Sequence, residues 1–179
     1  LNGDAVAALY RDDPRGVPYY SLYTELMTRL RPSSILEIGV RAGYSAFMML
    51  QGAGRGTYYH GIDYDDGSWG GVIGYTDHAR SMLKENFPAS DIRIDIADSQ
   101  QLTALPRRYD FINVDGAHGH CEALHDLELC WRYTDRMLVD DVKFIPTVGS
   151  AVDAFLVEHP EIRGTYYDTL RGHVLMERA

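Results

Sequence analysis

Short apolar runs alternate with helical patterns along most of this chain of 179 residues. Five runs rich in apolar and β-branched residues have the length of buried strands, and they cover residues 35–40, 58–63, 92–96, 111–114 and 137–139. Apolar positions recur at roughly helical spacing in four further segments, residues 44–50, 76–86, 120–131 and 150–159. Strands that alternate with helices in this way predict an α/β domain with a mostly parallel sheet.

The two ends of the chain add a helix and a hairpin to this pattern. Residues 19–30 predict an amphipathic helix, and Pro32 should end it because proline lacks a backbone N–H and clashes with the preceding turn. Residues 164–168 and 172–177 flank a turn-like segment and predict an antiparallel hairpin. Neither a repeat nor a linker interrupts the pattern, so we expect one domain over residues 1–179, with residues 1–31 as a helical lead-in and candidate substrate lid.

The charge of the chain argues against nucleic acid as a partner. The 17 Lys and Arg residues against 26 Asp and Glu residues give a formal net charge of −9. An acidic protein repels the phosphate backbone unless basic residues gather locally, and the longest basic run is Arg107-Arg108. We therefore expect no nucleic-acid partner.

Membrane and secretion signals are also missing from the pattern. The longest purely apolar run, residues 46–50, is far shorter than the roughly 20 residues of a membrane span, and the first residues lack the pattern of a leader peptide. The two cysteines, Cys121 and Cys130, lie nine residues apart in one helical pattern, roughly 13 Å from each other, which is too far for a disulfide. These observations predict a cytoplasmic protein with reduced thiols and no membrane partner.

Two glycines, Gly39 and Gly43, follow the first predicted strand, and Glu37 precedes them. A dinucleotide-binding turn would need a glycine where Arg41 stands, and the lysine of a phosphate-binding loop is missing. The pattern E-x-G-x-x-x-G suits a ligand without phosphate, because glycines let the backbone approach it and the N–H groups at the helix start can bind a carboxylate. A second acid, Asp63, ends the second predicted strand.

This turn resembles motif I of class I S-adenosylmethionine-dependent methyltransferases. In that family an acid at the end of the second strand, where this chain has Asp63, binds both ribose hydroxyls, and a polar residue after the third strand lies beside the adenine. The resemblance implies S-adenosylmethionine as the cofactor and the following cofactor-binding residues: Glu37, Gly39, Gly43, Asp63, Asp98 and Ser99. The alternative is that the glycines only form a tight turn and that Asp63 caps a loop.

The expected fold class is therefore α/β, a Rossmann-like, doubly wound, mostly parallel seven-stranded sheet with a C-terminal antiparallel hairpin.

In such a sheet ligands gather beyond the carboxyl ends of the strands. Asp115 ends the fourth predicted strand, and Asp140 and Asp141 follow the fifth. These carboxylates repel one another unless a cation neutralises them, and oxygen ligands favour Mg²⁺. The alternative is that Asp115 and Asp140 cap loops and that Asp141 is solvated.

The sequence Asp115-Gly116-Ala117-His118, combined with Asp140-Asp141, is similar to metal-dependent O-methyltransferases. The similarity is greatest to the group that includes macrolide-sugar O-methyltransferases and cephalosporin-hydroxylase-like proteins. It implies Asp115, Asp140 and Asp141 as ligands of Mg²⁺ and His118 as the base that removes the acceptor proton. Catechol-type relatives usually carry Asp-Asn after the fifth strand, so this pair favours the sugar or natural-product branch.

The expected function is a Mg²⁺-dependent O-methyltransferase that modifies a hydroxyl of a small polar acceptor, preferentially a sugar or a glycosylated natural product. Catechols remain an alternative acceptor because they also offer two adjacent oxygens. A metal-independent N- or O-methyltransferase, or a non-catalytic cofactor-binding subunit, would also be consistent with these motifs. The lid over the site should come from residues 1–23, from the loop 67–74 or from a neighbouring subunit of a homodimer.

Overall fold

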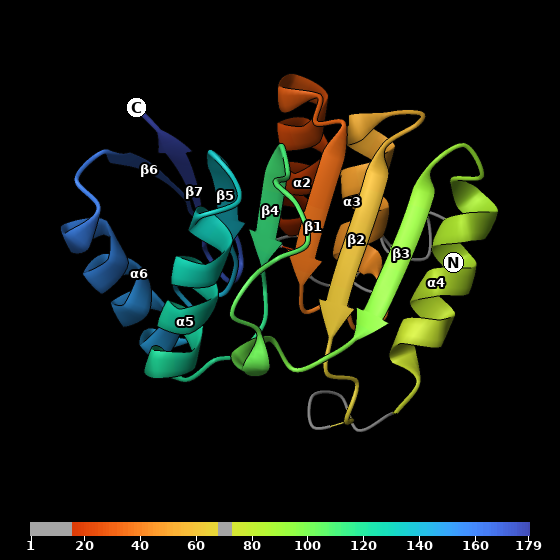
Figure 1. Cartoon of the computed structure of the whole chain (residues 1–179). Coiled ribbons are helices and arrows are strands. Elements are labelled where there is room, and N and C mark those ends of the chain that lie inside the picture. Colours follow the sequence, from red (N-terminus) through yellow and green to blue (C-terminus); the bar gives the residue numbers. More distant parts are fainter. Residues whose placement is uncertain (1–15, 68–72) are drawn as a thin grey trace.

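Seven strands form the sheet at the centre of the structure, a computed structural model that describes residues 16–67 and 73–179 (Figure 1). Their order across the sheet is β3-β2-β1-β4-β5-β7-β6. The strands are β1 (Ser34–Ile38), β2 (Tyr58–Asp63), β3 (Asp91–Ile96), β4 (Phe111–Val114), β5 (Arg136–Val139), β6 (Ile162–Tyr167) and β7 (His173–Arg178). Strands β1 to β5 are parallel, whereas β7 is antiparallel to both β5 and β6. The predicted α/β fold with a C-terminal antiparallel hairpin is confirmed.

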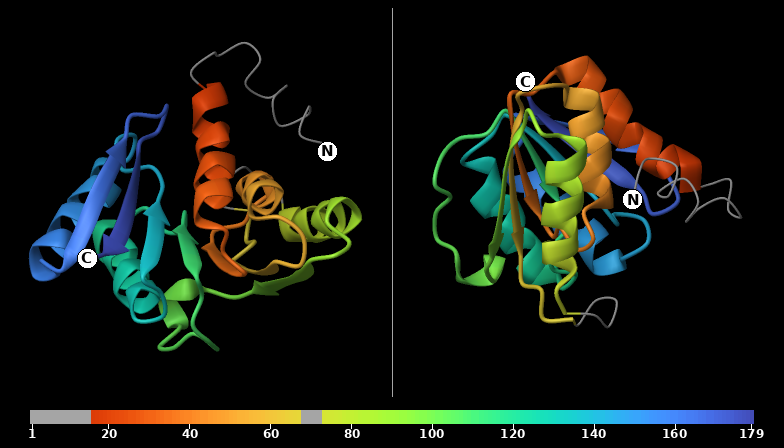
Figure 2. Two further views of the ribbon diagram at one scale, coloured as in Figure 1. Left: turned by 90° about the horizontal axis from the view of Figure 1, so that it is seen from above. Right: turned by 90° about the vertical axis from the view of Figure 1, so that its right-hand side faces the viewer.

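Helices cover both faces of the sheet (Figures 1 and 2). One face carries α2 (Gly16–Leu30), α3 (Tyr44–Ala53) and α4 (Tyr75–Asn86), and the other carries α5 (His120–Trp131) and α6 (Pro146–Glu158). A short 3₁₀ helix, η1 (Ser99–Gln101), follows β3. Because side chains alternate between the two faces of a strand, the buried apolar residues form two core clusters, one on each face of the sheet.

The predicted elements exist, and their boundaries move by a few residues. Helix α6 begins at Pro146 rather than at residue 150, because proline at the first helical position has its φ already fixed and needs no N–H partner. Cys121 and Cys130 lie on the same helix, α5, the first exposed and the second buried, and no disulfide joins them. No helix among the described residues is long and apolar enough to cross a membrane.

Part of the predicted lid lies outside the described residues, namely positions 1–15 and residues 68–72 of the loop 67–74. The remainder of the lead-in, α2, packs beside α3 (Figure 1). The extent of the domain and the identity of the lid stay predictions.

Candidate active site

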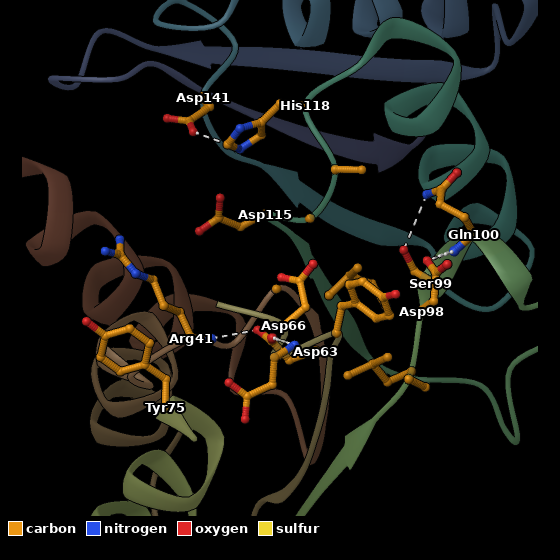
Figure 3. Close-up of a pocket in the computed structure, with 18 of the residues that line it drawn as sticks. Arg41, Asp63, Asp66, Tyr75, Asp98, Ser99, Gln100, Asp115, His118 and Asp141 are labelled. Atoms are coloured by element: carbon orange, nitrogen blue, oxygen red, sulfur yellow. Dashed lines mark hydrogen bonds and ion pairs between the residues drawn. The ribbon is translucent and has the colours of Figure 1, made fainter. Parts of the chain in front are cut away.

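A cavity of about 350 Å³ opens beyond the carboxyl ends of the parallel strands. Its walls come from the loops after β1, β2, β3, β4 and β5 and from the turn between β6 and β7. This volume lies in the range of small-molecule binding pockets, and its location is where α/β sheets bind ligands. Figure 3 shows the side chains that face it.

Gly39 and Asp63 form one end of the pocket, the glycine-turn end. Gly39 has a φ of +86°, and a Cβ at this position would lie only 1.9 Å from the carbonyl oxygen of Asp115. Only glycine fits here, because a side chain would both strain the backbone and collide with the end of β4. The glycine therefore lets the turn after β1 lie directly against the segment that carries Asp115.

The carboxylate of Asp63 fixes this turn. Its Oδ2 atom accepts hydrogen bonds of 2.7 Å from the backbone N–H groups of both Val40 and Arg41, and its Oδ1 atom accepts one of 2.7 Å from the backbone N–H of Asp65. A carboxylate has about four acceptor positions. Asp63 lines the cavity beside Asp66 (Figure 3). Because three of its acceptor positions are already occupied, about one is left for a hydroxyl donor, rather than two.

Glu37 does not line the cavity, in contrast to the expectation that it contacts the cofactor. It is fully buried on the α3 side of the sheet, where it accepts hydrogen bonds from Ser45 (2.6 Å), Asn113 (3.0 Å) and the hydroxyl of Tyr59. Burial raises the pKa of Glu37 to about 7, although these three donors oppose the shift. Its contacts therefore join β1, β2, β4 and α3 behind the glycine turn.

Gly43 also lies outside the walls of the cavity. It precedes α3 with a φ of +79°, and a Cβ here would approach the Cβ of Ala79 on α4 to 2.8 Å. The glycine is thus explained by its backbone conformation and by the close contact of α3 with α4.

Asp98 and Ser99 both line the cavity after β3, where the sequence predicted a polar contact with the adenine. Asp98 caps η1 by accepting a 3.0 Å hydrogen bond from the backbone N–H of Gln100. The sequence interpretation missed Gln100, which also lines the cavity and whose amide donates to Asp126 at 3.0 Å. Burial raises the pKa of Asp126 to about 6.

Asp115, His118 and Asp141 form the opposite end of the pocket, the carboxylate end (Figure 3). One potential ligand atom from each of them lies within 4.8 Å of the others, and His118 Nε2 is 3.3 Å from Asp141 Oδ2. Burial and the nearby carboxylates of Asp140 and Asp141 raise the pKa of Asp115 well above its ordinary value. The three residues come from two loops that the sheet brings together, as the sequence predicted.

A basic residue that the sequence interpretation missed also reaches this end. Arg171 lies in the turn between β6 and β7, and its Nη1 atom is 3.2 Å from both carboxylate oxygens of Asp141. Burial alone would raise the pKa of Asp141, but the hydrogen bond with His118 and the charge of Arg171 lower it below its ordinary value. A single arginine in a hairpin turn has no sequence signal that would reveal this contact.

Asp140 is not part of this cluster, although the sequence predicted it as the third metal ligand. It is buried on the other side of the loop, where it accepts hydrogen bonds from the hydroxyls of Tyr19 and Tyr23, the latter at 3.5 Å. His173 Nε2 lies 3.2 Å from its Oδ1 atom. Burial and the charge of Asp141 raise the pKa of Asp140 to about 7. The structure thus places His118, the predicted base, beside Asp115 and Asp141 and leaves Asp140 outside their cluster.

Strand alternation explains why two adjacent aspartates separate. Leu138 belongs to the core cluster beneath α2 and α3, whereas Val139 belongs to the cluster beneath α5 and α6. Asp140 continues on the side of Leu138, and Asp141, with a φ of +62°, turns into the cavity. Asp is one of the few non-glycine residues that adopt this left-handed conformation readily.

The donor set at the carboxylate end fits a divalent cation. The carboxylates of Asp115 and Asp141 lie close enough to share one ion, and carboxylates are ligands that proteins use for such cations. The imidazole of His118 lies within the same 4.8 Å, where it is placed either to bind that ion or to accept a proton. Carboxylates favour Mg²⁺ and Mn²⁺, while the imidazole also suits Zn²⁺. Arg171 is the charge that such a cation would meet at Asp141.

Comparisons with solved structures show where this fold occurs. An O-methyltransferase from Bacillus cereus in complex with SAH shares 17% identity, with 90% of this chain and 80% of that chain covered and a TM-score of 0.68. TomG from Streptomyces achromogenes, an O-methyltransferase involved in tomaymycin synthesis and solved with SAM, gives the same values. A putative caffeoyl-CoA O-methyltransferase from Staphylococcus aureus gives a TM-score of 0.71 at 14% identity, with 99% of both chains covered. These likenesses show the shared fold.

A match to a family model identifies the protein family, in addition to the fold. No curated protein sequence matches this chain. A family model described as a methyltransferase domain matches residues 36–141, which run from β1 through the carboxylate end of the pocket. The match contains Gly39, Asp63 and Asp141, and it confirms the methyltransferase resemblance of the sequence. The chain therefore belongs to the methyltransferase domain family.

Proposed function

We propose that this protein transfers a methyl group from S-adenosylmethionine to a hydroxyl oxygen of a small polar acceptor, with the help of a divalent cation. The observation that carries the proposal is the cluster of Asp115, His118 and Asp141 in the same cavity as the glycine turn. The family match supports methyl transfer. Two similar folds, the Bacillus cereus enzyme with SAH and TomG with SAM, support the cofactor.

The glycine-turn end and the adjoining loop would bind the cofactor. S-adenosylmethionine, when bound, supplies the electrophilic methyl group. Asp63 would accept a ribose hydroxyl, Gly39 would let the backbone approach the ligand, and Asp98 and Ser99 would lie at the adenine. Glu37 and Gly43 would not contact the cofactor. Glu37 would stabilise the glycine turn through its buried hydrogen bonds, and Gly43 would allow the close packing of α3 against α4.

The carboxylate end would prepare the acceptor. Asp115 and Asp141 would hold the cation, with Mg²⁺ as the expected ion, and a bound cation there supplies positive charge that favours ionisation of a hydroxyl. His118 would accept the hydroxyl proton on its imidazole, and Asp141, 3.3 Å away, would stabilise the imidazolium. Orientation of the acceptor toward the methyl group is then the main contribution of the pocket.

The acceptor that fits this chemistry has two adjacent oxygens. An aliphatic hydroxyl is hard to ionise near neutral pH, so chelation by a cation is a physical means of activating it. We favour a saccharide or a glycosylated natural product, with a catechol as the alternative. A cytoplasmic location and a homodimer stay predictions from the sequence.

Calorimetric titration tests the cofactor part of this proposal. Asp63→Ala should weaken binding of S-adenosylmethionine by roughly 10-fold to 100-fold, because it removes a charge-assisted acceptor. Asp77→Ala, which removes an exposed carboxylate on α4, is the matched control and should leave binding unchanged. Equal affinity in Asp63→Ala and in the unaltered protein would exclude Asp63 as a ligand-binding residue.

Turnover and cation binding test the roles of the carboxylate end. Asp115→Asn should abolish turnover that depends on Mg²⁺ while leaving cofactor affinity intact. His118→Ala should lower the turnover rate by roughly 10²-fold to 10⁴-fold, as expected for loss of a general base, and should leave cation affinity nearly unchanged. If His118→Ala instead lowers cation affinity as strongly as Asp115→Asn, then His118 is a ligand rather than the base.

A panel of acceptors tests the chelation argument. Methyl glycosides with adjacent hydroxyls, catechol, a monohydric alcohol and a simple amine would each be incubated with S-adenosylmethionine and Mg²⁺. We expect methylation of an acceptor with two adjacent oxygens. Preferential methylation of the amine or of the monohydric alcohol would contradict the proposed substrate class.

A metal-independent methyltransferase is the second candidate, and the contact between Arg171 and Asp141 favours it. In that case the guanidinium supplies positive charge beside the acceptor and no cation is needed. Full activity in excess EDTA would support this candidate, whereas loss of activity that Mg²⁺ or Mn²⁺ restores would support the first.

A further inference from the structure

Backbone hydrogen bonds anchor Arg171, and its side chain extends toward the carboxylate end of the pocket. Its carbonyl oxygen accepts hydrogen bonds from the N–H groups of Lys143 (3.0 Å) and Phe144 (2.9 Å), so the turn between β6 and β7 is bonded to the loop after β5. The guanidinium carbon lies 5.4 Å from the centre of the Phe144 ring, and 34% of the side chain is exposed. The backbone is thus anchored, and the partly exposed side chain forms part of the cavity wall.

The position of this guanidinium matters because of the charges around it. Asp115, Asp140 and Asp141 bring three carboxyl groups into a small volume, and the positive charge of Arg171 lies directly against one of them. A single atom, Nη1, contacts both oxygens of Asp141. A cation that bound between Asp115 and Asp141 would need an oxygen of Asp141 and would meet a positive charge there.

We propose that Arg171 is the internal counter-ion of the carboxylate end and that it competes with a divalent cation for Asp141. This inference rests on the proposed cation site. Like charges repel, so a bound cation and the guanidinium cannot both lie against the same carboxylate without loss of affinity. Since a third of its side chain is exposed, Arg171 can turn away from Asp141 toward the open cavity without crossing the core. Arg171 therefore sets how tightly the site holds its cation.

Calorimetric titration with MnCl₂ or MgCl₂, without cofactor or acceptor, tests this inference. Arg171→Gln should bind the cation roughly 10-fold to 100-fold more tightly than the unaltered protein, which is the size expected for loss of a competing charge-assisted pair. Arg171→Lys keeps the positive charge but not the geometry of the guanidinium, so its cation affinity should lie between those of the unaltered protein and Arg171→Gln.

Lys143→Gln is the matched control for long-range charge. Lys143 lies two residues after Asp141 but pairs with the exposed Asp168 at 2.5 Å, so its removal takes away one nearby charge without touching Asp141. We expect a change in cation affinity of less than about threefold, because exposed charges are screened by solvent and salt. A change in Lys143→Gln as large as that in Arg171→Gln would overturn the specific role of Arg171.

Thermal unfolding provides a second readout. Without its counter-ion the carboxylate end loses stability, so Arg171→Gln should unfold at a lower temperature than the unaltered protein in EDTA. Saturating Mn²⁺ should then raise its unfolding temperature by more than it raises that of the unaltered protein. An equal rise in both proteins would contradict the inference.

Failure of this inference can be distinguished from failure of the proposed function. Binding of S-adenosylhomocysteine, measured in the same samples, reports on the cofactor site and should be the same in all variants. If the unaltered protein binds Mn²⁺ and Arg171→Gln binds it equally or more weakly, the inference is wrong while the proposed function stands. If neither protein binds Mn²⁺ although both bind S-adenosylhomocysteine, the cation site itself is refuted, and the inference with it.

Discussion

At the glycine-turn end of the pocket Asp63 is bonded to backbone N–H groups, whereas at the carboxylate end Asp141 is bonded to the side chains of His118 and Arg171. The N–H groups of Val40 and Arg41 come from the same short motif as Gly39, so the first arrangement follows once β1 and β2 are adjacent. The second needs three loops to converge. Backbone contacts are therefore a property of the motif, while side-chain contacts depend on the whole sheet.

Behind each end lies a buried carboxyl group on the same side of the sheet. Glu37 supports the glycine turn and is bonded to Tyr59, and Asp140 supports the carboxylate end and is bonded to Tyr19. Burial raises the pKa of both groups to about 7. The causes differ in order. For Glu37 the hydrogen bonds from its neutral donors outweigh the charge of Asp63, whereas for Asp140 the charge of Asp141 is the largest effect after burial.

The largest effect should come from the contact that joins the two ends. Gly39→Ala places a Cβ 1.9 Å from the carbonyl oxygen of Asp115, so we expect a loss of about 4 kcal/mol or more in the free energy of unfolding. Gly56→Ala is the matched control, since Gly56 also has a positive φ, +81°, but has open space around it. It should cost only about 1–2 kcal/mol. Urea unfolding measures both, and equal costs would show that the two ends are not in tight contact.

The next effect concerns the glycine-turn end and depends on pH. The pKa of Glu37 is about 7 in the folded protein and near 4.5 when the chain is unfolded, so the folded state binds the additional proton between these values. The stability that this proton contributes is fully present below about pH 4.5 and is lost as the pH rises through about 7. Its size is on the order of 3 kcal/mol.

Glu37→Gln, which is neutral at every pH, should make the stability measured by urea unfolding fall less steeply between pH 4.5 and 8. Asp140, whose pKa is also about 7, should still contribute to the remaining fall. Glu85→Gln, on the exposed side of α4, should leave the profile unchanged. A profile for Glu37→Gln that still falls as steeply as that of the unaltered protein would mean that Glu37 is not the group responsible.

The smallest effect concerns the carboxylate end. Tyr19→Phe removes the hydroxyl that donates to the buried Asp140, which should lower the free energy of unfolding by about 1–2 kcal/mol. Tyr166→Phe removes an exposed hydroxyl that contacts Asp153 at 3.4 Å and should change stability by less than about 0.5 kcal/mol. A cost in Tyr19→Phe no larger than in Tyr166→Phe would show that α2 does not support this end through Asp140.

The sequence alone determined the order of strands and helices, because short apolar runs and helical periodicity are local properties. It also located Gly39, Asp63, Asp115, His118 and Asp141 at the walls of one cavity, since residues at the carboxyl ends of parallel strands lie at one edge of the sheet. Each of these residues either belongs to a motif or ends a strand, so its position follows from the fold class.

Only the tertiary structure decided which side of the sheet Glu37 and Asp140 occupy and that Arg171 reaches Asp141 from 30 residues further along the chain. Strand alternation turns the first two away from the cavity, but the phase of that alternation is fixed by burial against α2 and α3 rather than by their own sequence. Arg171 has no motif, and its contact exists because the antiparallel pairing of β7 with β5 brings the β6–β7 turn beside the loop after β5. Local periodicity specifies elements, whereas contacts between distant turns arise only when the sheet is assembled.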